Sequence, residues 1–312
     1  MLGVTVVGVL ASPAIITVAA VVDLAKRRVR FPRVSGAVPA PVRDQRQRRD
    51  RARTRLLGHG WLRYPPRHAD VDRPSRTAAA LVDRCPGPRA ERLLGLHLEI
   101  DAASMVALTP GPVVVLCRHV NIVDASLPSL LYQRLGYRTR GVIMAELLAD
   151  PGFDLIYART GSVFIPRDNG PEAIARIRGI GESVDSTTAV VIFPEGRLFR
   201  PDRLERAAAR LAAENPERAA RLASLGHVLP PRPGGVLALL DSIAADVVVI
   251  SHRGLDQFAS FADLAKAVPL RDPIEVAAWR LPRDEIPAGE AERIAWLDEQ
   301  WVRADAWIGG QR

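Results

Sequence analysis

The chain has 312 residues, a 48% share of hydrophobic residues and a formal net charge of +8. This length and apolar content allow one large domain with appended segments, and two cysteines, Cys85 and Cys117, give neither a disulfide framework nor a metal-type spacing. The excess of positive over negative charge comes from one block. Residues 26–63 hold 13 basic and 2 acidic residues, whereas the rest of the chain holds 30 basic and 33 acidic residues. A block of this kind argues against a nucleic-acid binder with a uniformly basic domain.

The first 22 residues carry no charge and are mostly Val, Leu, Ile and Ala. As a helix they would be roughly 33 Å long, which is enough to cross the hydrocarbon core of a bilayer. We therefore expect residues 1–25 to be a membrane anchor. It is either a transmembrane helix or, because Pro13 interrupts the run, a segment that re-enters one leaflet. A cleaved signal peptide, which would begin with a basic region, and a buried core helix are the alternatives.

Residues 26–89 form a basic juxtamembrane segment and linker. By the positive-inside rule, the basic residues from Lys26 to Arg33 put this side of the anchor in the cytoplasm. The Arg-rich run from Arg43 to Arg55 would attract anionic lipid head groups, by about 1 kcal/mol per residue near the surface; a solvated charge run is the alternative. Trp61 and Tyr64 are the aromatic residues beside it, which is few for a stacking surface that binds nucleic acid.

From residue 90 onward, short apolar runs rich in β-branched residues alternate with helical periods. The expected strands are Leu96–Ile100, Val113–Cys117, Thr139–Met144, Ser162–Ile165, Ala189–Phe193, Asp246–Ser251 and Pro273–Trp279. The expected helices are Ala125–Leu135, Pro171–Glu182, Leu204–Ala212, Pro216–Leu225 and Gly235–Ile243. This alternation predicts an α/β domain over residues 90–312, with a mostly parallel central sheet flanked by helices. G-x-S-x-G, P-loop and G-x-G-x-x-G patterns do not occur, which argues against hydrolases and nucleotide-binding enzymes of those types.

A histidine and an aspartate follow the second expected strand. Val113–Cys117 reads as a buried strand, so His119 falls in the turn after it and Asp124 in the first turn of the next helix. A neutral imidazole can take a proton from a hydroxyl, and a carboxylate on the other ring nitrogen fixes the tautomer and stabilises the imidazolium. The pattern predicts a general base at His119 with Asp124 as its partner. The alternative is a loop histidine beside an aspartate that caps the helix.

Three further places present polar side chains near the end of an apolar run or the start of a helix. Arg167 follows Pro166 at the end of an expected strand, where a guanidinium can bind phosphate; a surface arginine is the alternative. The run Phe193–Arg197 ends another strand, and its Pro and Gly predict a tight turn that presents Glu195. Arg232 lies in a Pro-rich run that opens a helix.

These places, in this order, resemble the sequence blocks of the glycerolipid acyltransferase family, which includes 1-acyl-glycerol-3-phosphate acyltransferase. Residues 118–124 resemble the first block, residues 161–167 the second and residues 193–196 the third. Residues 226–235 and 246–250, and in the C-terminal part Ile286-Pro287 and the helix with Trp296 and Trp301, are similar to the branch with lysocardiolipin-type and related acyltransferases. The resemblance covers roughly residues 93–308.

The resemblance implies transfer of an acyl group from acyl-CoA or acyl-carrier protein to the hydroxyl of a lysophospholipid, with 1-acyl-glycerol-3-phosphate as the first expectation. It implies that His119 is the general base and Asp124 its orienting partner. It implies that Arg167 binds the acceptor's phosphate and that Glu195 and Gly196 shape the acceptor site. The donor is a co-substrate, and no metal or other cofactor is expected, since a base and an oxyanion stabiliser suffice. We expect a cell-membrane enzyme with its catalytic domain on the cytoplasmic side, and anionic lipids but not nucleic acid among its partners.

The sequence departs from the family pattern at three places. Arg118 stands where asparagine usually precedes the histidine, Asn121 where serine is common, and Arg197-Leu198 where Thr-Arg usually follows the glycine. The base and its partner are intact, but the positive charges of the acceptor site are altered. We therefore include Arg118, Arg197 and Arg232 among the expected substrate-binding residues. Another lipid or glycolipid acceptor, or a lipid-binding protein of the same fold with little turnover, stays open.

Several residues carry weaker expectations. Cys117 lies in an apolar strand, so we expect it to pack and not to act as a nucleophile. His252 follows an expected strand, and a structural role is expected for it. Trp296, Trp301 and Trp307 suit a helix that packs on the domain or one that lies at a lipid interface.

Overall fold

The computed structural model describes residues 95–109, 111–121, 124–149, 157, 161–166, 170–258, 263 and 266–310. The expected anchor (residues 1–25), the basic segment (residues 26–89) and Arg167 lie outside these residues and stay predictions. Among the helices of the described part, none combines the length and apolar character needed to cross a bilayer. The elements below belong to a unit made of residues Arg92–Leu148 and Gly161–Arg312.

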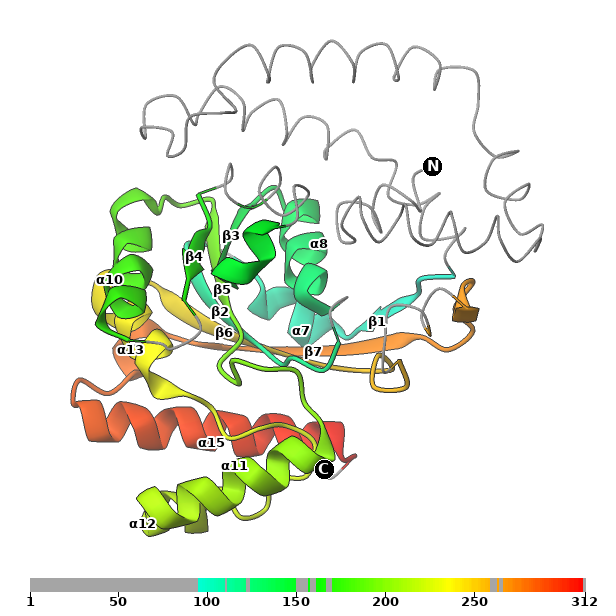
Figure 1. Cartoon of the computed structure of the whole chain (residues 1–312). Helices are drawn as coiled ribbons and strands as arrows, with labels where there is room; N and C mark the ends of the chain where they lie inside the picture. The colour runs from blue at the N-terminus through cyan, green and yellow to red at the C-terminus, as the bar shows by residue number, and fades with distance from the viewer. Residues whose placement is uncertain are drawn as a thin grey trace. The chain divides into compact units, whose positions relative to one another are not determined.

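The seven strands of the described residues form one sheet, in the order β1-β7-β6-β2-β5-β3-β4 (Figure 1). They are β1 (Leu98–Ile100), β2 (Val113–Cys117), β3 (Arg138–Met144), β4 (Val163–Ile165), β5 (Thr188–Ile192), β6 (Asp246–Arg253) and β7 (Ile274–Leu281). All neighbouring pairs are parallel except β6 and β7, which are antiparallel. The expected mostly parallel sheet is therefore confirmed. β2 has the expected bounds, and the other strands lie within about two residues of theirs.

Alternate residues of the central strand β2 point to opposite faces of the sheet, and each face buries its own cluster. Val113, Val115 and Cys117 pack in the cluster that includes residues of helices α7 and α8. Val114 and Leu116 pack in the cluster that includes residues of α10, α13 and α15. The covering helices are α7 (Ala102–Ala107), α8 (Leu127–Arg134), α10 (Pro171–Gly179), α13 (Pro233–Ser242) and α15 (Glu290–Ile308). β2 is thus buried on both sides, which is why its sequence is a continuous apolar run.

Proline marks the start of several helices. Pro171, Pro201, Pro216 and Pro233 begin α10, α11 (Pro201–Glu214), α12 (Pro216–Arg221) and α13. Proline suits the first helical position because its φ is already helical and its missing N–H would be unpaired there. The expected helix Ala125–Leu135 instead begins with a 3₁₀ turn at Asp124–Ser126, and the α-helix starts only at Leu127, next to Pro128.

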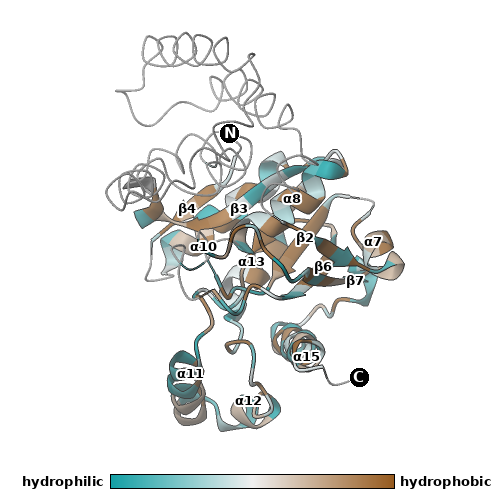
Figure 2. Cartoon of the chain, turned by 90° about the vertical axis from the view of Figure 1, so that its right-hand side faces the viewer, coloured by the Kyte–Doolittle hydropathy of each residue, from teal (hydrophilic) through white to brown (hydrophobic). Residues whose placement is uncertain are grey.

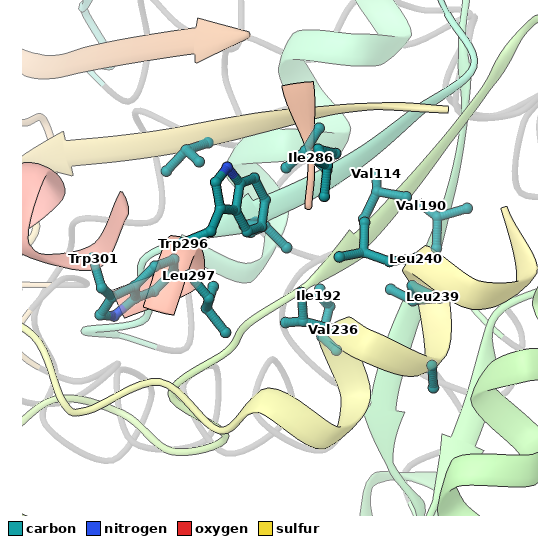
Figure 3. Packing of buried hydrophobic residues seen from close by; sticks show 14 of the residues in the cluster. Val114, Val190, Ile192, Val236, Leu239, Leu240, Ile286, Trp296, Leu297 and Trp301 are labelled. Carbon is teal, nitrogen blue, oxygen red and sulfur yellow. The ribbon is translucent and has the colours of Figure 1, made fainter. Parts of the chain in front are cut away.

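The tryptophans of α15 pack on the sheet. Trp296 and Trp301 are buried in the same cluster as Val114 and Leu239, and Figure 3 shows Trp296 and Leu297 on the side of the sheet that α13 also covers. The ring of Trp307 lies 4.5 Å from the guanidinium carbon of Arg253. Of the two expectations for this helix, packing on the domain is the one observed.

Two carboxylates of α15 hold the segment that leads to Arg232. Asp298 forms a buried ion pair with Arg218 of α12, with 2.7 Å between Arg218 Nη2 and Asp298 Oδ1. Asp305 accepts hydrogen bonds from the backbone N–H groups of Gly226, His227 and Val228. The helices α11 and α12 project from the domain (Figures 1 and 2), and α11 has no buried residue. The buried ion pair between Arg218 and Asp298 connects α12 to α15 and thereby to the rest of the domain.

Candidate active site

His119 and Asp124 meet across the turn that follows β2. The Nδ1 atom of His119 lies 2.6 Å from Oδ1 of Asp124. The other carboxylate oxygen accepts hydrogen bonds from the backbone N–H groups of Val120 and Asn121. Asp124 is fully buried, so these bonds replace the water that its charge would otherwise need. Val120 and Asn121 precede Asp124 in the chain, whereas a residue that caps a helix accepts hydrogen bonds from N–H groups after it. These contacts therefore differ from those of a helix cap.

The second nitrogen of the imidazole is open. The His119 side chain keeps 19% of its surface exposed, and Nε2 has no hydrogen-bond partner among the described residues. Burial lowers the pKa of His119, but the charge and hydrogen bond of Asp124 raise it, and the net shift is upward from 6.5. With Nδ1 donating to the carboxylate, Nε2 of the neutral ring is an acceptor that can take a proton from a bound hydroxyl.

Glu195 connects the turn of His119 to two other segments. It follows β5, is buried, and accepts hydrogen bonds from the backbone N–H groups of His119 (2.8 Å) and Leu229 (2.9 Å). Burial raises the pKa of this carboxyl to about 8, although the two backbone hydrogen bonds oppose the shift. Glu195 therefore holds the His119 turn from inside the protein. Both oxygens of its carboxylate accept from backbone N–H groups, and the expectation that Glu195 shapes the acceptor site stays a prediction.

Gly196, Arg197 and Arg232 lie together beside the same turn. Gly196 has φ +64°, and a side chain there would come within 3.1 Å of Cδ of Arg232. The backbone N–H of Arg232 donates to the carbonyl of Pro194 (2.8 Å). Burial lowers the pKa of Arg232, and the charges of Arg197 and Arg210 lower it further. Neither Arg197 nor Arg232 pairs with a carboxylate in the described part of the chain, so this place carries uncompensated positive charge.

Arg118 points into the protein. Its side chain is 1% exposed, and its guanidinium donates to the backbone carbonyls of His252 (2.7 Å) and His227 (3.1 Å) and pairs with Asp256. A guanidinium held in this way has protein groups as its partners, and this geometry gives no support to the expected substrate contact at Arg118. The other expected phosphate ligand, Arg167, lies outside the described residues.

His252 lies behind the carboxylate of Asp124. It is fully buried at the end of β6, with Nε2 3.3 Å from the carbonyl oxygen of Arg118 and 3.6 Å from Oδ2 of Asp124. Burial lowers the pKa of His252, which keeps the ring neutral. From the sequence we expected a structural role for His252 but named no partner for it, and we expected no role for Asp256. Their link to His119 depends on the pairing of β2 with β6, and the sequence pattern does not indicate that pairing.

Comparison with known proteins gives a family match and a structural likeness. The family model described as Acyltransferase matches residues 102–252, a span that contains His119, Asp124 and Glu195. No curated protein sequence matches the chain. Among solved structures, the 1-acyl-sn-glycerophosphate (LPA) acyltransferase PlsC from Thermotoga maritima is similar with a TM-score of 0.49 and 15% identity; the match covers 81% of this chain and 87% of that chain.

Proposed function

The chain belongs to the acyltransferase family through residues 102–252, and we propose that it transfers a fatty acyl group to the hydroxyl of a lysophospholipid. The donor is acyl-CoA or acyl-carrier protein, and 1-acyl-glycerol-3-phosphate is the first candidate acceptor. The observation that carries this proposal is the pair of His119 and Asp124, 2.6 Å apart, with the open Nε2 beside it. The acyl donor is a co-substrate, and the proposed reaction uses no other cofactor.

The proposed mechanism begins with neutral His119. Its Nε2 takes the proton of the acceptor hydroxyl while the hydroxyl oxygen attacks the thioester carbonyl carbon. Asp124 stabilises the imidazolium through the hydrogen bond to Nδ1. When the tetrahedral intermediate collapses, the carbon–sulfur bond breaks and the imidazolium returns the proton to the leaving thiolate. The products are an ester and a free thiol, and His119 is neutral again.

The acceptor's phosphate is proposed to bind at Arg197 and Arg232, with Arg167 as a third arginine from outside the described residues. The support is the uncompensated charge of these two guanidinium groups beside the His119 turn. A guanidinium matches a phosphate group through two parallel hydrogen bonds. Gly196 leaves room for Arg232 to lie against the backbone of this loop.

Membrane association is also part of the proposal. The uncharged residues 1–25 are proposed to anchor the enzyme, and the basic residues of segment 26–89 to contact anionic lipids, with the catalytic domain on the cytoplasmic side. A site beside a membrane suits donors and acceptors with long acyl chains.

The test is acyl transfer by the purified, detergent-solubilised full chain from a panel of acyl-CoAs and acyl-carrier protein to lysophosphatidic acid. We expect the His119→Ala variant to lose about 10²–10⁴-fold in kcat, the usual contribution of a general base. We expect Arg232→Ala to raise the acceptor KM about tenfold with little change in kcat, because it removes a charge-assisted hydrogen bond to the bound acceptor. Arg178→Ala, an exposed arginine of α10 that pairs with Asp241, is the matched control and should change neither constant.

Each part of the proposal has an outcome that overturns it. Full activity in His119→Ala would remove the histidine from the mechanism. An inert lysophosphatidic acid beside an acylated uncharged lipid or glycolipid would keep the acyltransferase and replace its acceptor.

A further inference from the structure

We propose that Arg118 and Asp256 form a latch that positions His119, by holding the turn after β2 against the loop that follows β6. This inference rests on the proposed role of His119 as the base. The contacts of Arg118 and Asp256 given below are to protein groups, so we assign both as positioning residues. The latch comprises Arg118 and its contacts to His227, His252 and Asp256, together with the contact of Asn121 to Phe258.

Arg118 connects three segments that are far apart in the sequence. One guanidinium nitrogen donates to the carbonyl of His252 at the end of β6, 2.7 Å away. The other donates to the carbonyl of His227, 3.1 Å away, and to the carboxylate of Asp256. The guanidinium is buried, whereas the Asp256 side chain is 41% exposed. Asp256 thus supplies the negative charge that a buried arginine needs.

A second contact ties the same turn to the same loop. The side-chain N–H₂ of Asn121 donates to the carbonyl of Phe258, two residues beyond Asp256. The carbonyl of Arg118 lies 3.3 Å from Nε2 of His252, which is also 3.6 Å from the carboxylate of Asp124. Arg118 and Asn121 are the two positions where the His119 turn departs from the family pattern. Both of these residues therefore bond to the loop that follows β6.

The position of His119 follows from that of Arg118. The two residues are adjacent, so a guanidinium fixed inside the protein directs the next side chain toward the open site, where 19% of the His119 surface is exposed. If the arginine is released, the turn can shift and lengthen the hydrogen bond to Asp124. A displacement of about 1 Å in a catalytic group can cost about 10²-fold in rate.

The test uses the full chain and three variants: Asp256→Asn, Arg118→Asn and the double variant. We expect each single variant to lose at least about tenfold in kcat while the KM of acceptor and donor stays within about twofold.

The double variant should lose no more than the worse single variant, because the two residues act as one unit. Arg118→Lys should fall between wild type and Arg118→Asn, since lysine keeps the charge but not the planar fork. Glu275→Gln in β7 is the matched control, because its side chain is 44% exposed and pairs with Arg253, the residue after His252 in β6. It should leave kcat unchanged.

A second readout does not need acyl transfer. In histidine-labelled protein, the His119 resonance is assigned with His119→Ala and its pKa is measured by NMR titration. The titratable groups facing His119 are Asp124 and Glu195, and both are kept in the variants. We expect the pKa of His119 to fall in Asp256→Asn as the contact with Asp124 loosens, and circular dichroism should show a folded domain.

The two proposals fail in different ways. If wild type transfers no acyl group but the pKa of His119 moves as expected, the latch stands and the proposed function falls. If the variants keep wild-type kcat and an unchanged pKa of His119, the latch is overturned. A rise in acceptor KM with constant kcat would also overturn it, because Arg118 and Asp256 would then contact the substrate.

Discussion

The imidazole of His119 has a buried carboxylate on one side and an open face on the other, and the carboxylate raises its pKa above 6.5. Below that pKa the ring is protonated and cannot accept a proton; above it the ring is neutral. We therefore expect kcat/KM for acyl transfer to rise with pH and to level off, with a midpoint above 6.5 in the wild-type protein.

Replacing Asp124 with Asn removes the charge that raises the pKa of His119. The midpoint of the pH profile should then move to lower pH, and kcat should fall by about 10³-fold or more because the ring tautomer is no longer fixed. The measurement is the pH dependence of kcat/KM in both proteins. An unchanged midpoint would mean that Asp124 is not the source of the raised pKa.

At the scale of elements, α15 is connected to α12 through Asp298, which pairs with the buried Arg218 at 2.7 Å and with the more exposed Arg221 at 3.5 Å. Asp298 is 1% exposed, so Asp298→Ala would leave a guanidinium without its charge partner in a dry environment. We expect a loss of about 3–5 kcal/mol in the free energy of unfolding, measured by denaturant titration.

The control for Asp298→Ala is Glu172→Ala, which breaks the exposed pair with Arg176 on α10. Exposed pairs of this spacing contribute little, so the control should keep the wild-type midpoint. Equal losses in the two variants would show that burial of the Arg218–Asp298 pair has no special effect.

The strands β2 and β5 were predictable from sequence because each is a short apolar run, rich in β-branched residues, that is buried along its whole length. The helix α7 was not expected, since Ala102–Ala107 is only six residues long and too short to show a helical period. The order of the strands was not predicted either. Which strands become neighbours depends on packing across the whole domain, which local patterns do not record.

The same limit applies to the candidate site. The meeting of His119 and Asp124 was predictable because five residues and one turn separate them. The direction of Arg118 was not, because its partner Asp256 lies 138 residues further along the chain. From its place beside His119, Arg118 was expected to contact a substrate, whereas its guanidinium donates to the carbonyls of His227 and His252.

At the scale of the whole molecule, the concentration of positive charge in the basic segment predicts that this segment strengthens binding to anionic membranes. Changing Arg46, Arg48, Arg49 and Arg51 to Gln should weaken binding to vesicles that contain phosphatidylserine. At about 1 kcal/mol per residue the loss is about fivefold for each arginine. The measurement is vesicle co-sedimentation at two salt concentrations, with and without residues 1–25.

The control for this prediction changes four exposed arginines of the domain in place of those in the basic segment. They are Arg176, Arg178, Arg206 and Arg210. Because these arginines are already paired with carboxylates, their loss should change vesicle binding little. A loss equal to that of the first variant would mean that net charge, and not the basic segment, controls binding.

The central position of β2 in the sheet also has a consequence for folding during translation. β2 pairs with β5 on one edge and β6 on the other, so neither edge has its partner until residues 188–192 and 246–253 have been made. At about 5–20 residues per second, the ribosome needs roughly 6–26 seconds to travel from the end of β2 to the start of β6. Both edges of β2 lack a partner until β5 has been made, and the edge that pairs with β6 stays open to other nascent chains for the whole of that time. We expect the cell to cover it with a chaperone until β6 emerges and closes the sheet around it.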